Sequence, residues 1–237
     1  MSPLIIAHRG DTKNAVENTL SAIESAIQLG VDGIEVDLQL TRDGHVVVFH
    51  DWDLKRLHGS SAIVQESTLA ELKDISRGPH QIPTLEELLD LAGKRTFLNL
   101  ELKTLFYFKS DLEKKVVEIL LPLFAKEGAG GRSLQLSSFN TFALWHLKKL
   151  APHLERAYLY QDNPLIHRAL MPIVKASSVN IPLRYLSKNF CETFHKAGRK
   201  LFIWTVNDEN DMKRCIEHNV DGIITDEPRR LLSLIRP

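Results

Sequence analysis

Polar residues follow short apolar runs at four places in this chain, and their types could support chemistry. The four clusters are His8-Arg9, Glu35-x-Asp37, His50-Asp51 and Glu101-x-Lys103. The ends of strands are where a barrel or an open α/β sheet displays its active site. Imidazoles exchange protons near neutral pH, carboxylates hold hard divalent cations, and arginine and lysine bind anions. Together the clusters indicate metal-assisted chemistry on a phosphate ester.

The acidic residues are spaced so that their side chains project together. Side chains two positions apart on a strand point to the same face, which joins Glu35 to Asp37, and Glu101 repeats the pattern on the next barrel strand. Three converging carboxylates repel one another, and a hard, oxygen-liganded cation such as Mg²⁺ or Ca²⁺ would relieve that repulsion. The alternative interpretation is a strand-end salt-bridge network of Glu35 and Asp37 with Arg9 and Lys103.

Two histidines stand at expected strand exits. His8 and His50 each follow an apolar run, and either could serve as proton donor or acceptor. A single histidine is equally well explained as a hydrogen-bonded structural residue, but two of them beside acidic and basic partners favour chemistry. Arg9 offers a guanidinium fork suited to a phosphate, and structural pairing with Glu17 or Asp37 is its alternative.

Two other positions have simpler local explanations. Asn18 and Thr19 precede an expected helix, where either residue would cap the first turn, and capping accounts for Asn18 on local grounds. Trp204 ends an apolar run, where its ring would pack either on the apolar edge of a ligand or in the core.

The composition is that of an ordinary globular protein. Of the 237 residues, 43% are hydrophobic and 25% are charged, which allows a full core and argues against disorder. Thirty Lys and Arg balance thirty Asp and Glu, which removes the broad electrostatic case for binding nucleic acid or an anionic membrane. No apolar run approaches the length of a membrane span and no signal peptide is recognisable, so we expect a soluble, cytoplasmic protein without stable membrane insertion.

Short β-branched or apolar runs alternate with amphipathic stretches along the chain. Eight runs predict strands at 4–7, 33–38, 96–100, 133–137, 156–160, 177–181, 200–204 and 222–224. Apolar residues spaced three or four apart predict helices near 19–29, 85–92, 112–126, 140–150, 164–174, 188–197, 209–218 and 228–235. Eight such pairs predict a (β/α)8 TIM barrel, an α/β fold, as a single domain over residues 1–237.

One stretch departs from the alternation. Asp43-Gly44 turns directly into the apolar run 45–49, so a hairpin is expected after the second barrel strand. The chain then makes an insertion over about 51–83, with a short helix at 69–75, of the kind that often covers or forms a site. Thr84 and Glu87 match a capping box at the start of the next helix.

With these residues in place, the chain resembles the glycerophosphodiester phosphodiesterase family, of the cytoplasmic bacterial type, over nearly its whole length. The resemblance is carried by segments in a specific order, namely 7–10 (AHRG), 17–19 (ENT), 33–37 (GIEVD), 41–44 (TRDG), 48–51 (VFHD), 82–87 (IPTLEE), 99–103 (NLELK), 137–139 (SSF), 204–207 (WTVN) and 222–226 (GIITD). The loop 11–16 departs from the small, Gly/Ala-rich loop with a proline that the family usually has at this place.

The resemblance implies a TIM barrel with a small insertion after the second strand, and hydrolysis of glycerophosphodiesters to sn-glycerol 3-phosphate and an alcohol. It also implies roles for single residues: Glu35, Asp37 and Glu101 as ligands of one divalent cation, Mg²⁺ or Ca²⁺; His8 and His50 as the acid-base pair; Arg9 and Lys103 as phosphate contacts; Phe139 and Trp204 as the glycerol side of the pocket. The nucleophile is either water or the neighbouring glycerol hydroxyl, which would give a cyclic phosphate.

Two other functions fit parts of the pattern. A lysophospholipase D-like phosphodiesterase would need an exposed apolar rim, for which the insertion offers Trp52, Leu54, Leu57 and Ile63. A non-catalytic barrel that binds a phosphate ligand would be favoured if a metal or acid-base position were missing, and all are present. A metal-dependent aldolase or isomerase gives no reason for paired histidines beside a phosphate-binding group.

Overall fold

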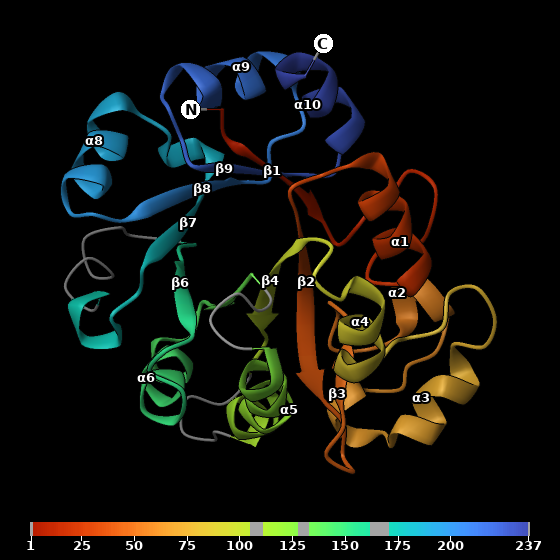
Figure 1. Cartoon of the computed structure of the whole chain (residues 1–237). Helices are drawn as coiled ribbons and strands as arrows, with labels where there is room; N and C mark the ends of the chain where they lie inside the picture. Colours follow the sequence, from red (N-terminus) through yellow and green to blue (C-terminus); the bar gives the residue numbers. More distant parts are fainter. Residues whose placement is uncertain (1, 105–110, 128–132, 162–170, 237) are drawn as a thin grey trace.

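The eight predicted strands form a closed parallel barrel in this computed structural model, which describes residues 2–104, 111–127, 133–161 and 171–236 (Figure 1). Its strands are β1 (Leu4–His8), β2 (Gly33–Leu40), β4 (Phe97–Leu102), β5 (Leu134–Ser138), β6 (Glu155–Leu159), β7 (Ser178–Pro182), β8 (Lys200–Trp204) and β9 (Gly222–Thr225). Hydrogen-bonded neighbours run in the order β1-β9-β8-β7-β6-β5-β4-β2, and pairing of β1 with β2 closes the ring. The predicted (β/α)8 barrel is therefore confirmed.

Helices surround the strands in Figure 1. They are α1 (Leu20–Leu29), α4 (Leu85–Ala92), α5 (Asp111–Glu127), α6 (Thr141–Leu150), α8 (Lys188–Lys196), α9 (Glu209–Glu217) and α10 (Pro228–Ile235), with a short 3-10 helix, η3, at Leu183–Tyr185. The helix predicted at 164–174 lies mostly outside the described residues. Within the described ranges, no helix combines the length and the apolar character that crossing a bilayer requires. The cytoplasmic location stays a prediction of the sequence.

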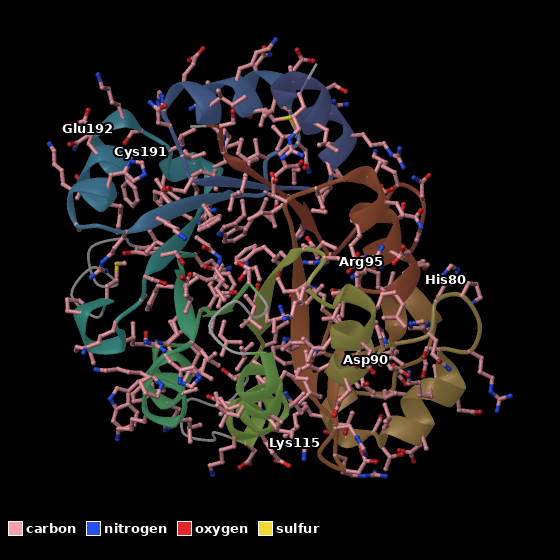
Figure 2. All side chains as sticks on the ribbon, in the orientation of Figure 1. His80, Asp90, Arg95, Lys115, Cys191 and Glu192 are labelled. Carbon is pink, nitrogen blue, oxygen red and sulfur yellow. The ribbon has the colours of Figure 1, made fainter. Side chains whose placement is uncertain are left out.

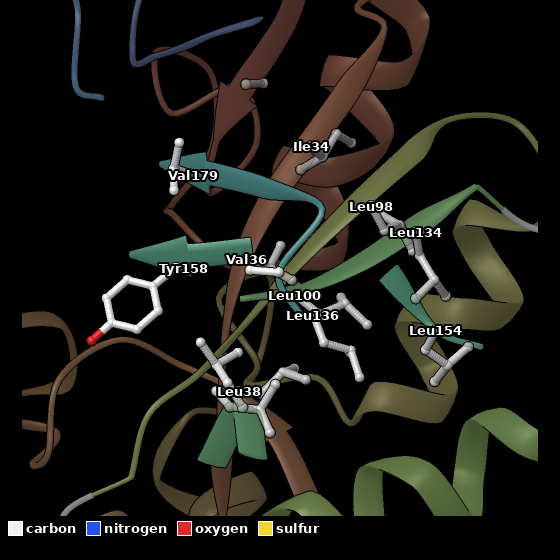
Figure 3. Packing of buried hydrophobic residues seen from close by; sticks show 14 of the residues in the cluster. Ile34, Val36, Leu38, Leu98, Leu100, Leu134, Leu136, Leu154, Tyr158 and Val179 are labelled. Atoms are coloured by element: carbon white, nitrogen blue, oxygen red, sulfur yellow. The ribbon is translucent and has the colours of Figure 1, made fainter. Parts of the chain in front are cut away.

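The main core lies between the barrel strands and the helices. Ile34, Val36 and Leu38 alternate along β2 and are completely buried, and Figure 3 shows them packed among leucines of the neighbouring strands. Burial of each such side chain contributes about 1.5–3 kcal/mol to folding. The helices carry charged side chains as well, such as Asp90 of α4, which is exposed, and Lys115 of α5, which is partly exposed; both are labelled in Figure 2. The alternation of side chains along each strand thus sends the intervening residues into the barrel.

The interior of the barrel is unusually polar. Branched apolar side chains usually fill such an interior. Here the inward positions of β4, β5 and β7 carry buried polar residues, namely Asn99, Gln135, Ser137, Ser178 and Asn180. Ser178 donates a hydrogen bond to Gln135, with 2.8 Å between the oxygen atoms. The carboxylates at the strand ends therefore lie next to a layer of buried polar side chains inside the barrel.

The predicted hairpin is present after β2. Strand β3 (Val46–Val48) pairs antiparallel with β2, and Gly44 in the turn has φ 84°, a conformation that glycine adopts without steric cost. The chain then forms α2 (Lys55–His58), a 3-10 helix η1 (Val64–Glu66) and α3 (Leu69–Ile75) before α4 begins. A second apolar cluster lies under this excursion and consists of Val47, Phe49, Leu54, Val64, Leu72 and Ile82. The predicted capping box of Thr84 and Glu87 starts α4.

Candidate active site

Three carboxylates, two buried and one partly buried, meet at the carboxyl ends of β2 and β4. Glu35 and Asp37 lie on β2, and Glu101 of β4 is the register partner of Asp37. Each of the three offers one oxygen atom, and these atoms all lie within 4.8 Å of one another. Parallel strands place residues of matching register side by side, so the two-residue spacing in the sequence becomes a cluster in space.

The charges of this cluster are unevenly balanced. Burial, with the charges of Asp37 and Glu101 nearby, raises the pKa of Glu35 well above its ordinary value. Burial and the charge of Asp37 also raise the pKa of Glu101 to about 7. The pKa of Asp37 is lowered, because the cations Arg9 and Lys103 outweigh the effect of its burial. The two glutamates therefore lack adequate positive charge from the protein alone.

Both interpretations of the acidic residues apply to part of this cluster. Asp37 forms ion pairs with Arg9 Nε at 3.1 Å and Lys103 Nζ at 3.6 Å, as the salt-bridge alternative requires. Glu35 differs: its buried Oε2 atom has no hydrogen-bond partner among the described residues. A buried carboxylate oxygen without a partner is costly, and a hard cation would satisfy it. The three carboxylates thus fit a bound Mg²⁺ or Ca²⁺.

The two predicted histidines face this cluster, and each is held by a carboxylate. His8 Nδ1 lies 2.6 Å from Asp226 Oδ1, and its Nε2 lies 3.7 Å from Glu35 Oε2. His50 Nδ1 lies 2.7 Å from Asp51 Oδ1. Burial lowers the pKa of His50, although the negative charge of Asp37 acts in the opposite direction. A carboxylate at Nδ1 orients an imidazole and leaves Nε2 for a reacting group.

Arg9 is positioned by unusual backbone geometry. Its φ of 58° lies in the left-handed region, which a non-glycine residue occupies only when its surroundings enforce it. Gly10 follows with φ 93°, and a Cβ atom there would lie 2.7–2.8 Å from Ala22 of α1. Arg9 Nη1 also lies 2.8 Å from Glu17 Oε1. The close packing of Gly10 on α1 thus turns the guanidinium over the carboxylates.

These residues surround a cavity of about 330 Å³ at the carboxyl ends of the strands. Its lining consists of His8, Arg9, Glu35, His50, Asn99, Glu101, Lys103, Phe139, Leu159, Gln161, Trp204, Thr205 and Ile224. Phe139 and Trp204 meet edge to face, with 5.7 Å between the ring centroids. Asp37 does not line the cavity and lies beneath Arg9 and Lys103, almost completely buried. The structure therefore brings every predicted site residue into one region.

Asn18 requires a correction. Thr19 is the N-cap residue of α1 and accepts a hydrogen bond from the backbone of Ala22, so capping does not explain Asn18. Asn18 instead has φ 59° and donates its amide to Asp37 Oδ2 at 2.9 Å. An isolated asparagine before a helix gave no local sign of this contact. Asp226 was likewise not predicted, because its partner His8 lies at the opposite end of the chain.

The barrel and this cavity define a class of protein: an α/β-barrel enzyme whose site brings together clustered carboxylates, two histidines oriented by carboxylates, and the cations Arg9 and Lys103. Residues 8–230 match the model of the Glycerophosphoryl diester phosphodiesterase family. The chain therefore belongs to this family, and the enzyme class implied by the resemblance is confirmed.

Proteins named glycerophosphodiester phosphodiesterase are similar to this chain over nearly its whole length and nearly the whole of their own. A glycerophosphodiester phosphodiesterase of Caldanaerobacter subterraneus is 40% identical over 100% of this chain and 99% of its own. One of Bacillus altitudinis is 35% identical over 97% of both chains. Among solved structures, an Oleispira antarctica phosphodiesterase in complex with the product sn-glycerol-3-phosphate has a TM-score of 0.87 at 29% identity, covering 100% of this chain and 98% of that one. A glycerophosphodiester phosphodiesterase from Thermotoga maritima has a TM-score of 0.82 at 29% identity over 99% of each chain.

Proposed function

We propose that this chain hydrolyses glycerophosphodiesters to sn-glycerol 3-phosphate and an alcohol, with one divalent cation and two histidines. The observation that carries the proposal is the convergence of three carboxylate oxygens within 4.8 Å beside two carboxylate-held imidazoles. The product in the Oleispira antarctica structure supports the same substrate class.

Glu35, Asp37 and Glu101 would hold the cation, Mg²⁺ or Ca²⁺. When bound, such an ion supplies positive charge that polarises a phosphoryl oxygen. Among the described residues, six acidic side chains lie in the site or contact its members (Glu17, Glu35, Asp37, Asp51, Glu101 and Asp226), against three permanent cations (Arg9, Arg56 and Lys103). Acidic groups outnumber the cations once Glu35 and Glu101, whose pKa values are raised, have lost their protons. An anionic diester would be repelled by that balance, so the cation also makes substrate binding favourable.

Arg9 and Lys103 bind the non-bridging phosphate oxygens, because both line the cavity and both carry permanent positive charge. One histidine removes a proton from the nucleophile and the other protonates the departing alkoxide. We assign His50 as the base, since burial lowers its pKa and so keeps the imidazole free to accept a proton at pH 7. Phe139 and Trp204 form the apolar wall on which the glycerol carbons pack.

A lipid substrate receives less support. Of the apolar residues in the excursion, Trp52 and Ile63 are 36% and 38% exposed, but Leu54 is completely buried and Leu57 packs against the second cluster. A small apolar rim of this kind favours small glycerophosphodiesters over lysophospholipids.

The test begins with protein stripped by a chelator and supplied with glycerophosphocholine or glycerophosphoethanolamine and Mg²⁺, Ca²⁺ or Mn²⁺. We expect release of sn-glycerol 3-phosphate only with an ion present. ³¹P NMR during turnover distinguishes the nucleophiles, because attack by the glycerol hydroxyl gives a cyclic phosphate first. His8→Ala and His50→Ala should each lose at least about a hundredfold in turnover. Absence of product with every ion would instead favour the non-catalytic, phosphate-binding barrel.

A further inference from the structure

Arg56 belongs to the excursion between β3 and α4 and does not line the cavity. Its side chain contacts two carboxylates that support residues of the site. Arg56, in the short helix α2, donates to both carboxylate oxygens of Glu17, with Nη1 at 2.9 Å and Nη2 at 2.6 Å. Its Nε donates to Asp51 Oδ2 at 2.6 Å. All three types of guanidinium nitrogen are thus engaged by two carboxylates that belong to different parts of the chain.

Each of these carboxylates continues to a residue of the cavity. The second oxygen of Asp51 lies 2.7 Å from His50 Nδ1. Glu17 Oε1 lies 2.8 Å from Arg9 Nη1. Arg56 is therefore one residue removed from the expected acid-base group and, on its other side, one residue removed from the expected phosphate-binding group.

We propose that Arg56 is a positioning residue that sets the orientations of His50 and Arg9 together. The inference rests on the proposed function, since it takes the roles of His50 and Arg9 from it. In the absence of Arg56, the side-chain contacts left within the described part of the chain would be that of Glu17 with Arg9 and that of Asp51 with His50. Both carboxylates could then turn, which would leave the His50 ring without a fixed partner and the Arg9 guanidinium oriented by Asp37 in place of two anchored carboxylates.

The geometry requires an arginine. A planar guanidinium presents Nε along one edge and two terminal nitrogens along another, which allows a bidentate contact with Glu17 and a contact with Asp51 at the same time. A lysine ammonium is a single point charge on a flexible stem and cannot hold both carboxylates in fixed directions.

The base of α2 is fixed by packing. Leu54, which precedes the helix, is completely buried in the second apolar cluster, and its backbone N–H donates to the carbonyl of Ala62 at 3.0 Å. The excursion after β3 thus supplies a firm support from which Arg56 extends to the barrel. It contributes to the site through this contact, although α2 itself lies outside the cavity lining.

A purely structural role makes a different prediction. The Arg56 side chain is 47% exposed, and exposed ion pairs contribute little to folding stability. Replacing Arg56 should therefore leave the unfolding temperature almost unchanged while altering catalysis. If Arg56 only stabilised the fold, its replacement would lower the unfolding temperature and leave the kinetics of the folded fraction normal.

The experiment compares Arg56→Gln and Arg56→Lys with Arg42→Gln in the full chain. Arg42 is a matched control, because it also makes two contacts near the excursion, to the Glu66 carbonyl and to Glu71, and lies outside the site. The measurements are kcat and KM with saturating metal, the dissociation constant of inorganic phosphate, and the thermal unfolding curve.

We expect Arg56→Gln to lower kcat/KM by about 10- to 100-fold, the usual effect of removing an orienting partner. The loss should divide between a lower kcat, from His50, and a weaker phosphate affinity, from Arg9. Arg56→Lys should recover only part of it, and Arg42→Gln should match the wild type.

Wild-type kcat and phosphate affinity in Arg56→Gln would overturn the inference alone. So would full recovery by Arg56→Lys, or kinetic losses that only follow a lower unfolding temperature. Inactivity of the wild-type protein with every ion would instead reject the proposed function.

Discussion

His8 Nδ1 lies 2.6 Å from Asp226 Oδ1, although 218 residues separate the two in the chain. The contact exists because β1 and β9, the first and last strands of the barrel, pair with each other. Asp226 stands just after β9 and accepts a second hydrogen bond from Asn207 at 2.7 Å. It therefore holds the His8 ring in one orientation, with Nε2 towards Glu35.

We predict that Asp226→Asn lowers kcat by between about 10-fold and 10⁴-fold, because an uncharged partner no longer fixes the tautomer and orientation of His8. Asp221→Asn is a matched control. Asp221 precedes the same strand and pairs with His195 at 2.8 Å, at the opposite end of the barrel from the site. Steady-state kinetics should show normal kcat in Asp221→Asn, and equal losses in both variants would refute a specific role for Asp226.

Glu35→Gln should have opposite effects on metal binding and on folding. Loss of an anionic ligand should weaken the affinity for Mg²⁺ or Ca²⁺ by more than about 10-fold, the lower end of what even an outer partner contributes. The metal-free protein should become more stable, because a neutral amide avoids the cost of burying a carboxyl group whose Oε2 atom has no hydrogen-bond partner among the described residues. Calorimetric titration and thermal unfolding without metal measure the two effects. A Glu35→Gln variant that binds metal as tightly as the wild type would contradict the assignment.

Metal affinity should rise with pH. The pKa of Glu101 is about 7 in the metal-free protein, so this carboxyl keeps its proton well above its ordinary range. A raised folded-state pKa means that the folded protein binds the proton more tightly than the unfolded chain. The contribution of Glu101 to metal-free stability therefore falls as pH rises from the ordinary value towards 7.

Metal binding requires the deprotonated carboxylate, so the stabilisation by saturating metal should be larger at about pH 8 than at about pH 5.5. The unfolding temperature, measured with and without Mg²⁺ at both pH values, checks this. Glu101→Gln should bind metal weakly at both values. If Mg²⁺ raises the unfolding temperature of the wild-type protein equally at both pH values, Glu101 is not a ligand.

Trp204→Ala should raise KM more than it lowers kcat. The indole meets Phe139 edge to face at the cavity wall. Burial of one substrate CH₂ group against this wall is worth about 0.8 kcal/mol, so its loss corresponds to a KM increase of roughly 4-fold. Phe142→Ala removes a 43% exposed ring of α6 outside this lining and should leave KM unchanged. If KM for glycerophosphocholine responds equally in both variants, Trp204 does not contact the substrate.

Arg156→Met should destabilise the fold without affecting the site. The Arg156 side chain is buried and donates to four backbone carbonyls, those of Ala151, Pro152, Leu154 and Val174. Leaving these acceptors without a donor should cost about 2–4 kcal/mol of unfolding free energy, measured by urea titration. Lys213→Met, at an exposed ion pair of α9, should stay within about 0.5 kcal/mol of the wild type. A normal unfolding free energy in Arg156→Met would show that water replaces these contacts.

Local patterns accounted for most elements of the fold. Thr84 and Glu87 form the predicted capping box, and the turn at Gly44 forms the predicted hairpin, because both depend on neighbouring residues alone. The eight strands were also predictable, since apolar runs of this length are bounded by turn residues. Their observed ends differ from the predicted ones by at most two residues, and strand 200–204 matches at both ends.

The sequence by itself determined which chemical groups are available and on which face of each strand they lie, because side-chain direction alternates with a fixed period of two. Glu35, Asp37 and Glu101 could be grouped in this way. Only the tertiary structure decided which groups meet across the barrel: Asp226 with His8, and Asn18 with Asp37. These contacts depend on strand register and on closure of the ring between the first and last strands, and neither property is encoded in any short segment.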